Sequence, residues 1–427
     1  MLPAVTIAAA LLSLADPPAA PAAAPAAAPA ATPSAPPAPA APAKPARPIP
    51  PDFQPAEGPI LSKHRQLTFP DRFLKAGESY FSPNDHQVIF QAIERPAGDT
   101  APSEFYSMYV AEVQMDCSGR PTALINIRRI SPEGSANTCG WFHPTDPNRV
   151  IFGSTIVPPT NRETPGYQRG TGKYRWQFPP EMRIVEVNLR HADGSAGSLK
   201  TLVGDGNGYV AEGSISPDGR WLLYTQVDPV TQGDLWVMDM QSGAKTRLVN
   251  APGYDGGPFF TPDGKGIIFR SDRAGNSLLQ VYAADLVFDG AGRITGIAKE
   301  RPLTANEQVN WCPFYHPDGK HFVYGTSEVG HSNYEVFMRD ATDPARAVRI
   351  TNWPGADVLP VFSHNGRTML WTAQRGPEKS SQLWCADFDL EAAMRAPAFV
   401  PPPASEGAAM PDAKPAPAAP APAGTAR

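Results

Sequence analysis

The sequence predicts an all-β fold, a six-bladed β-propeller over residues 59–390, and three observations support this prediction. A unit of three short strands recurs six times, and one clear copy runs from Tyr254 to Leu286. A weaker fourth strand follows five of these copies, whereas a sixth, Arg65–Thr68, stands before the first copy. Propellers close in this way, because a strand from one end of the chain completes the last blade and leaves only short edges.

Each copy contains a tight turn between its first two strands. The six turns read SPND at 82–85, HPTD at 143–146, SPDG at 216–219, TPDG at 261–264, HPDG at 316–319 and SHNG at 363–366. Proline presets the backbone for the second position of a type I turn, and glycine accepts the positive φ that follows the aspartate. We therefore expect the aspartates of these turns to act as turn formers only.

Apolar runs mark the strands on both sides of every turn and the third strand that follows them. The second runs are VIF, VIF, LLY, IIF, FVY and MLW in chain order, and most third runs end near Asp or Glu. The fourth strands are IRRIS, LKTLV, TRLV, RPLT and VRIT, and RQLT at 65–68 is the displaced copy. The competing fold, a β-sandwich, explains neither this period nor the displaced strand.

Both ends of the chain differ in composition from the repeats. We assign residues 1–15 to a candidate signal peptide, 16–58 to a Pro/Ala-rich linker and 391–427 to a disordered Pro/Ala-rich tail. The apolar run Val5–Leu14, which ends in the small-x-small sequence Ser13-Leu14-Ala15, resembles the apolar region and cleavage site of a secretory signal, so we expect export to the periplasm or cell surface. The run is too short to span a bilayer, so we expect no transmembrane segment. The alternative is an Ala-rich cytoplasmic N-terminus.

Net charge and cysteine content argue against a nucleic-acid partner and against two kinds of cysteine-based site. A net charge of -5 gives no electrostatic reason to expect a nucleic-acid partner. The four cysteines are far apart and include no CxxC pair, so neither a zinc ribbon nor a disulfide framework is expected.

The innermost strands begin with a set of polar residues. These are Glu78, Cys139, Glu212, Asp255, Asn310 and Asp357, and they lie five or seven residues before the second residue of each turn. Inner strands line the channel and residues two apart share a face, so we expect a partly acidic ring at one channel mouth. Such a ring could bind a partner's basic segment or a divalent cation. The alternative is that these side chains only bond neighbouring backbone amides.

Blade two carries the one large departure from the repeat, an insertion between Ile156 and Glu181. It contains Arg162, Tyr167, Arg169, Lys173, Tyr174, Arg175 and Trp176, and blade five adds His331 in the corresponding loop. Aromatic and arginine side chains are typical of recognition surfaces, so we predict a partner-binding loop here. The alternative is that the insertion packs against the propeller wall.

The repeat pattern LT…PxxSPDGxxIxFxSDRxGxxxIYxxDL resembles that of TolB-type propellers, which is also seen in the propellers attached to prolyl oligopeptidases. The resemblance covers all six blades, and it implies an envelope-protein partner, Pal in the case of TolB. TolB carries an α/β domain before its propeller, and here the Pro/Ala segment occupies that place. No GxSxG elbow is present, and we expect no hydrolase domain.

These observations lead us to expect a monomeric, non-catalytic module without a cofactor, which binds an envelope protein or a cell-wall or saccharide component. The alternative is an enzyme, since propellers resembling this one include carbohydrate-active lyases that use a channel-bound metal. Those lyases rely on clustered histidines, and the histidines of this sequence are scattered.

Overall fold

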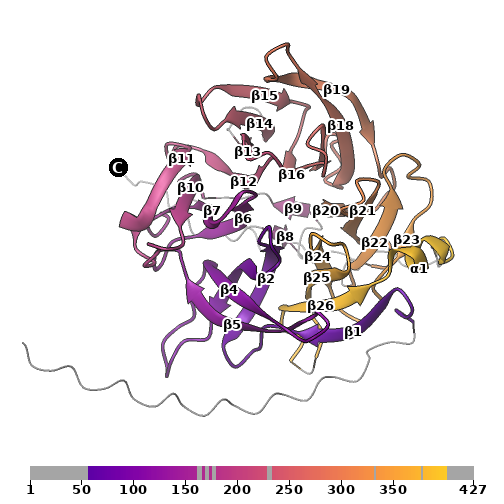
Figure 1. Cartoon of the computed structure of the whole chain (residues 1–427), viewed down its shortest axis with the longest axis horizontal. Coiled ribbons are helices and arrows are strands. Elements are labelled where there is room, and N and C mark those ends of the chain that lie inside the picture. The colour runs from indigo at the N-terminus through magenta and orange to yellow at the C-terminus, as the bar shows by residue number, and fades with distance from the viewer. Residues whose placement is uncertain are drawn as a thin grey trace, which may run out of the picture. The chain divides into compact units, whose positions relative to one another are not determined.

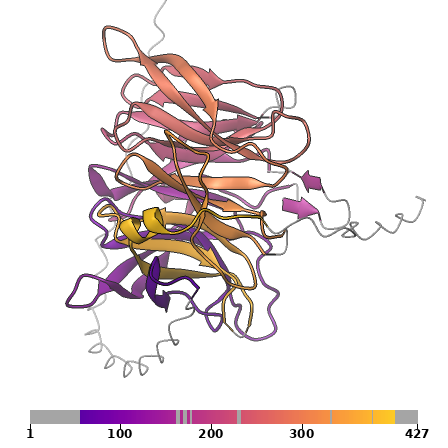
Figure 2. The same ribbon diagram turned by 90° about the vertical axis from the view of Figure 1, so that its right-hand side faces the viewer.

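The computed structural model describes residues 56–401, with gaps at 161–165, 169–172, 176–178, 228–232, 331–332 and 377. Of residues 166–168 and 173–175 it describes the backbone only. Within this part of the chain, six four-stranded antiparallel sheets surround a central channel, along which Figure 1 looks. Figure 2 shows the same sheets from the side. The predicted six-bladed propeller is confirmed.

The blades follow one another in chain order, and in each blade the strands run from the innermost to the outermost. Blade one contains β2 (Phe73–Phe81), β3 (Gln87–Glu94), β4 (Ser107–Met115) and β5 (Pro121–Arg129). Blade two contains β6 (Asn137–His143), β7 (Asp146–Ser154), β10 (Arg183–Asn188) and β11 (Leu199–Val203). Blade three contains β12 (Tyr209–Ile215), β13 (Trp221–Val227), β14 (Asp234–Asp239) and β15 (Lys245–Val249).

The second half of the ring repeats this order. Blade four contains β16 (Asp255–Phe260), β17 (Gly266–Ser271), β18 (Gln280–Phe288) and β19 (Ile294–Pro302). Blade five contains β20 (Asn310–Tyr315), β21 (His321–Thr326), β22 (Glu335–Asp340) and β23 (Val348–Arg349). Blade six contains β24 (Asp357–Phe362), β25 (Thr368–Ala373), β26 (Gln382–Phe388) and β1 (Leu61–Gln66).

Blade six is closed by the two ends of the propeller. The N-terminal strand β1 pairs antiparallel with β26, from Leu61 opposite Phe388 to Gln66 opposite Trp384. In Figure 1 the indigo β1 accordingly lies beside the yellow β26. The predicted closing strand at 65–68 is therefore confirmed, although it begins four residues earlier, at Leu61.

The antiparallel order gives the propeller two distinct faces. The turns between first and second strands, and the connections between third and fourth strands, lie on one face, which we call the turn face. The connections between second and third strands lie on the other, the loop face. Asp263 accepts hydrogen bonds from Thr261 Oγ1 (2.6 Å) and Lys265 N (3.0 Å), and Gly264 has a φ of +69°. These are the roles expected of a turn former.

Neighbouring blades bury both faces of each sheet. The second strands therefore carry consecutive buried apolar residues rather than an alternating pattern. In β17, for example, Ile267, Ile268 and Phe269 are all fully buried. Burial of such a side chain contributes about 1.5–3 kcal/mol to stability, so these six apolar runs account for much of the core.

Described structure continues beyond the predicted propeller boundary at residue 390. Helix α1 (Leu390–Arg395) begins after Asp389, whose side chain accepts a hydrogen bond from Ala392 N. Further on, the Phe399 ring packs against Phe337 with 4.9 Å between ring centroids. These residues lie in the segment that the sequence assigns to the Pro/Ala tail, and apolar contacts hold them against blade five.

Candidate functional site in the central channel

Each innermost strand contains a β-bulge at the same position. The pairing register shifts there in all six blades. The six bulge residues have positive φ: Glu78 (41°), Cys139 (53°), Glu212 (57°), Gly257 (56°), Cys312 (46°) and Leu359 (55°). Each lies five residues before the second residue of its turn. Because a bulge redirects its side chain, this set faces the channel together.

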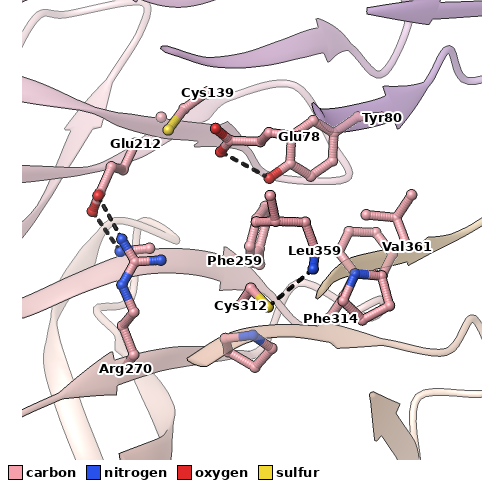
Figure 3. Close-up of a pocket in the computed structure, with 14 residues that line it drawn as sticks. Glu78, Tyr80, Cys139, Glu212, Phe259, Arg270, Cys312, Phe314, Leu359 and Val361 are labelled. Atoms are coloured by element: carbon pink, nitrogen blue, oxygen red, sulfur yellow. Dashed lines mark hydrogen bonds and ion pairs between the residues drawn. The ribbon is translucent and has the colours of Figure 1, made fainter. Parts of the chain in front are cut away.

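The bulge residues line a small chamber in the channel, drawn in Figure 3. Its volume is about 30 Å³, which suffices for water or a small ion but not for a sugar ring. The chamber brings together three of the predicted mouth residues, Glu78, Cys139 and Glu212. Sequence reasoning did not identify its other charged residue, Arg270, which comes from the second strand of blade four.

Glu212 is the fully satisfied carboxylate of the chamber. Arg270 Nη2 donates to its Oε1 at 2.6 Å, and the Tyr254 hydroxyl donates to both of its oxygens at 2.7 Å. Thr225 Oγ1 (2.8 Å) and Gly257 N (2.6 Å) donate to Oε2. This network joins blades three and four inside the channel, and its main effect is structural.

Glu78 has weaker compensation for its burial. It accepts hydrogen bonds from Tyr80 Oη (3.4 Å) and Thr138 Oγ1 (3.2 Å), and among the described residues that line the chamber no cationic side chain bonds it directly. Burial raises the pKa of this carboxyl, although the hydrogen bond with Cys139 opposes the shift. Burial and the charges of Glu78 and Glu212 also raise the pKa of the Cys139 thiol well above its usual value. Near neutral pH this thiol is therefore a protonated, weakly nucleophilic group.

The other three predicted mouth residues do not face the chamber. Asp255 is buried and pairs with Arg273 Nη2 at 2.9 Å. Burial raises the pKa of Asp255 to about 6, against the opposing effects of Ser271 and Arg273. Asn310 donates to Gln280 Oε1 (3.0 Å) and Asn306 Oδ1 (2.7 Å).

Asp357 belongs to a buried ionic cluster at the blade-six closure. Arg375 Nη2 lies 2.6 Å from Asp357 Oδ2 and 2.6 Å from Glu57 Oε1. His64 Nε2 is 2.6 Å from the other oxygen of Glu57. Burial alone would raise the pKa of Glu57, but hydrogen bonds from His64 and Arg375 outweigh it and lower the pKa to about 2. Asp357 thus helps to fasten the N-terminal segment to the last blade.

The blade-two insertion lies between β7 and β10, on the loop face. Its base is closed, because Thr160 N donates to Glu181 Oε1 at 3.0 Å and Thr160 Oγ1 bonds the same atom. Farther out, β8 (Gly166–Gln168) pairs with β9 (Lys173–Arg175), which places Tyr167 opposite Tyr174 in the backbone pairing. Arg162, Arg169, Trp176 and His331 lie outside the described residues.

Two features are absent from the part of the chain that the structure describes. No three of its His, Cys, Asp and Glu side chains gather closely enough to hold a metal ion. None of its helices is long and apolar enough to cross a membrane.

Comparison with known proteins identifies TolB proteins among the relatives. No protein-family model matches the chain. It is 25% identical over 180 residues to the Tol-Pal system protein TolB of Wolinella succinogenes, which covers 41% of this chain and 39% of that protein. It is 24% identical over 237 residues to the Tol-Pal system protein TolB of Francisella tularensis, covering 52% of this chain and 51% of that protein. The chain thus spans about half or less of the curated relatives' length.

Solved propellers show a more distant likeness. A putative TolB from Agrobacterium tumefaciens has a TM-score of 0.43 at 16% identity, over 74% of this chain and 91% of that one. An oligogalacturonate lyase from Vibrio parahaemolyticus has a TM-score of 0.43 at 12% identity, over 76% of this chain and 93% of that one. Likeness at this level carries no functional inference. The repeats, the closed ring of blades and the curated relatives together identify the chain as a TolB-like six-bladed β-propeller.

Proposed function

We propose that this protein is an exported, envelope-associated propeller that binds a protein or another envelope component through its loop face, without catalysing a reaction. Similarity to Tol-Pal system proteins supports an envelope role. The observation that carries the choice of face is the blade-two insertion, which interrupts the repeat between β7 and β10. Its arginines and aromatic residues suit recognition of an acidic or saccharide surface.

The test replaces the insertion and leaves the propeller intact. Thr160 and Glu181 already bond one another, so residues 161–179 can be exchanged for a short Gly/Ser linker without opening blade two. Full-length protein and this variant are used to capture partners from envelope extract, after crosslinking in intact cells. The captured material is assayed specifically for Pal, the partner that the resemblance implies. We expect the variant to lose the captured partner.

A control variant addresses the opposite face. The β18–β19 tip, Asp289–Arg293, lies on the turn face, and replacing it with a Gly/Ser linker of equal length should leave capture unchanged. Equal recovery by wild type and the insertion variant would refute the role of the insertion. Loss of capture only in the tip variant would move the binding surface to the turn face.

Export has an independent test. We expect cell fractionation to recover the protein outside the cytoplasm, with a mature N-terminus after Ala15. A cytoplasmic protein with an intact N-terminus would contradict this part of the proposal.

A further inference from the structure

The channel has a second hollow, which opens on the turn face. It is a cup of about 370 Å³, and its floor consists of the rings of Tyr80, Trp141, Phe259 and Phe314. Every pair of these four rings is in contact, with centroids 5.0–6.3 Å apart. Tyr80, Phe259 and Phe314 also line the chamber, so these three rings, with Trp141 packed against them, separate the chamber from the cup.

The cup has an apolar lining with a proline-rich rim. Each blade contributes the second residue of its turn to the rim: Pro83, Pro144, Pro217, Pro262, Pro317 and His364. None of the described residues that line the cup is Asp, Glu, Lys or Arg. Trp141, Phe259 and Phe314 remain partly exposed. An uncharged hollow with partly exposed aromatic rings suits a ligand that is itself uncharged and rich in rigid apolar rings.

The described chain ends on the same face as the cup. Asp387 of β26 pairs with Thr368, two residues after the blade-six turn, so α1 follows at the turn face. Arg346, in the connection between β22 and β23, donates to Met394 O at 2.9 Å. Phe399 N then donates to Ala347 O at 2.8 Å. The chain therefore leaves the propeller from the rim of the turn face.

The residues beyond this point have the composition that such a cup accepts. Residues 402–427 include the uncharged run PAPAAPAPA at 415–423, and the whole segment has two acidic and two basic residues. Proline-rich segments favour the polyproline II conformation and dock into aromatic-lined grooves. A segment of the length of 402–414 would span about 40 Å in that conformation at ~3.1 Å per residue, whereas the four strands of a blade extend over about 15 Å. The tether is thus long enough to reach the channel axis.

We propose that the turn-face cup is a binding site for polyproline II segments, and that its occupant is the protein's own C-terminal run, residues 415–423. Tethering gives this run an effective concentration in the millimolar range, so weak docking suffices to fill the cup. A proline-rich segment of another protein would compete with the tail for the same rings. The cup is thereby a second interaction surface, separate from the loop face.

The test measures solvent access to the cup in the full-length chain. Hydroxyl-radical footprinting reports on Trp141, Phe259 and Phe314, and Trp311 serves as a reference outside the cup. The test variant changes Pro415, Pro417, Pro420 and Pro422 to Ala. The matched control makes the same change at Pro21, Pro25, Pro29 and Pro33 in the N-terminal Pro/Ala segment.

We expect labelling of the three cup rings to rise at least two-fold in the C-terminal variant, and to stay unchanged in the control and at Trp311. Protection should also be independent of protein concentration, because the tail binds its own propeller. Equal labelling of wild type and the C-terminal variant would overturn the proposal. A rise in the N-terminal control, or protection that weakens on dilution, would overturn the assignment of the occupant to this tail in cis. Unchanged melting temperatures confirm that neither tail variant disturbs the fold.

Discussion

A single glycine makes room for the positive charge of the chamber. Gly257 has a φ of +56°, and a Cβ at this residue would lie 2.5 Å from Arg270 Nη1. The other five blades place a side chain at the equivalent bulge position. The missing side chain in blade four therefore leaves the space in which the Arg270 guanidinium meets Glu212.

Replacement of this glycine should break the buried ion pair. In Gly257→Ala the added methyl group displaces the guanidinium, which leaves Glu212 without its cation. Removing one partner from a buried pair costs about 3 kcal/mol, so we expect the free energy of unfolding to fall by roughly that amount. Chemical denaturation measures the change. Gly296→Ala in β19 is the control, because a Cβ there has open space. Equal effects of the two substitutions would contradict the steric explanation.

The bulges explain what the sequence could not predict at residue level. Strict alternation would have placed Asp255 and Gly257 on one face of β16, and likewise the equivalent residues of the other blades. The extra residue of each bulge interrupts that alternation, so Glu78 and Glu212 face the chamber while Asp255 and Asp357 enter separate buried clusters. One signal was present in the sequence. Glu78, Cys139, Glu212, Gly257, Cys312 and Leu359 share one offset from the turn, and Arg270 is a charged residue in an otherwise apolar second strand.

At the scale of elements, β1 and the residues before it hold the ring shut. Strand β1 covers the edge of β26, and Glu57 forms two hydrogen bonds with Arg375, at 3.0 and 2.6 Å. The side chains of Glu57, Asp357 and Arg375 in this cluster are all fully buried. Loss of the segment would therefore expose a strand edge and leave a buried cation with one partner fewer.

Two truncations separate the closing segment from the Pro/Ala linker. Removal of residues 1–68 should abolish cooperative unfolding or lower the melting temperature by more than about 10 °C, and it should favour aggregation through the β26 edge. Removal of residues 1–55 leaves Glu57 and β1 in place and should keep the native melting temperature. Calorimetry and light scattering distinguish these results. If the protein lacking residues 1–68 unfolds like the full-length chain, closure by β1 is dispensable.

At the scale of the whole molecule, the repeat made the fold predictable. Six copies of one unit fixed the number of blades, and the displaced RQLT predicted the closure, because both depend on local pattern and on the need to cover strand edges. The partition of the channel into a chamber and a cup was not predictable in this way. It depends on side chains from four blades, Tyr80, Trp141, Phe259 and Phe314, that meet only when the ring is closed.

The pH dependence of stability is another property of the assembled molecule. Burial raises the pKa of Asp255 to about 6 and that of Glu335 to about 7. At pH values between the ordinary pKa values of these two carboxyls and the raised ones, the native protein still binds protons that the unfolded chain has released. These two carboxyls therefore make the free energy of unfolding fall as pH rises from about 4 to about 7. The lowered pKa of Glu57, about 2, acts in a lower pH window and opposes this trend only there.

Asp255→Asn provides the decisive variant for this dependence. The amide stays neutral throughout and keeps hydrogen-bonding capacity toward Arg273 through its oxygen, so we expect a shallower decline of stability with pH than in wild type. The difference should amount to about 2 kcal/mol between pH 4 and pH 7, since one pKa unit corresponds to about 1.4 kcal/mol. Urea denaturation at a series of pH values measures it, with Glu378→Gln as the control because Glu378 is exposed. If D255N and wild type decline in parallel, burial of Asp255 is not the source of the slope, and Glu335 becomes the group to substitute.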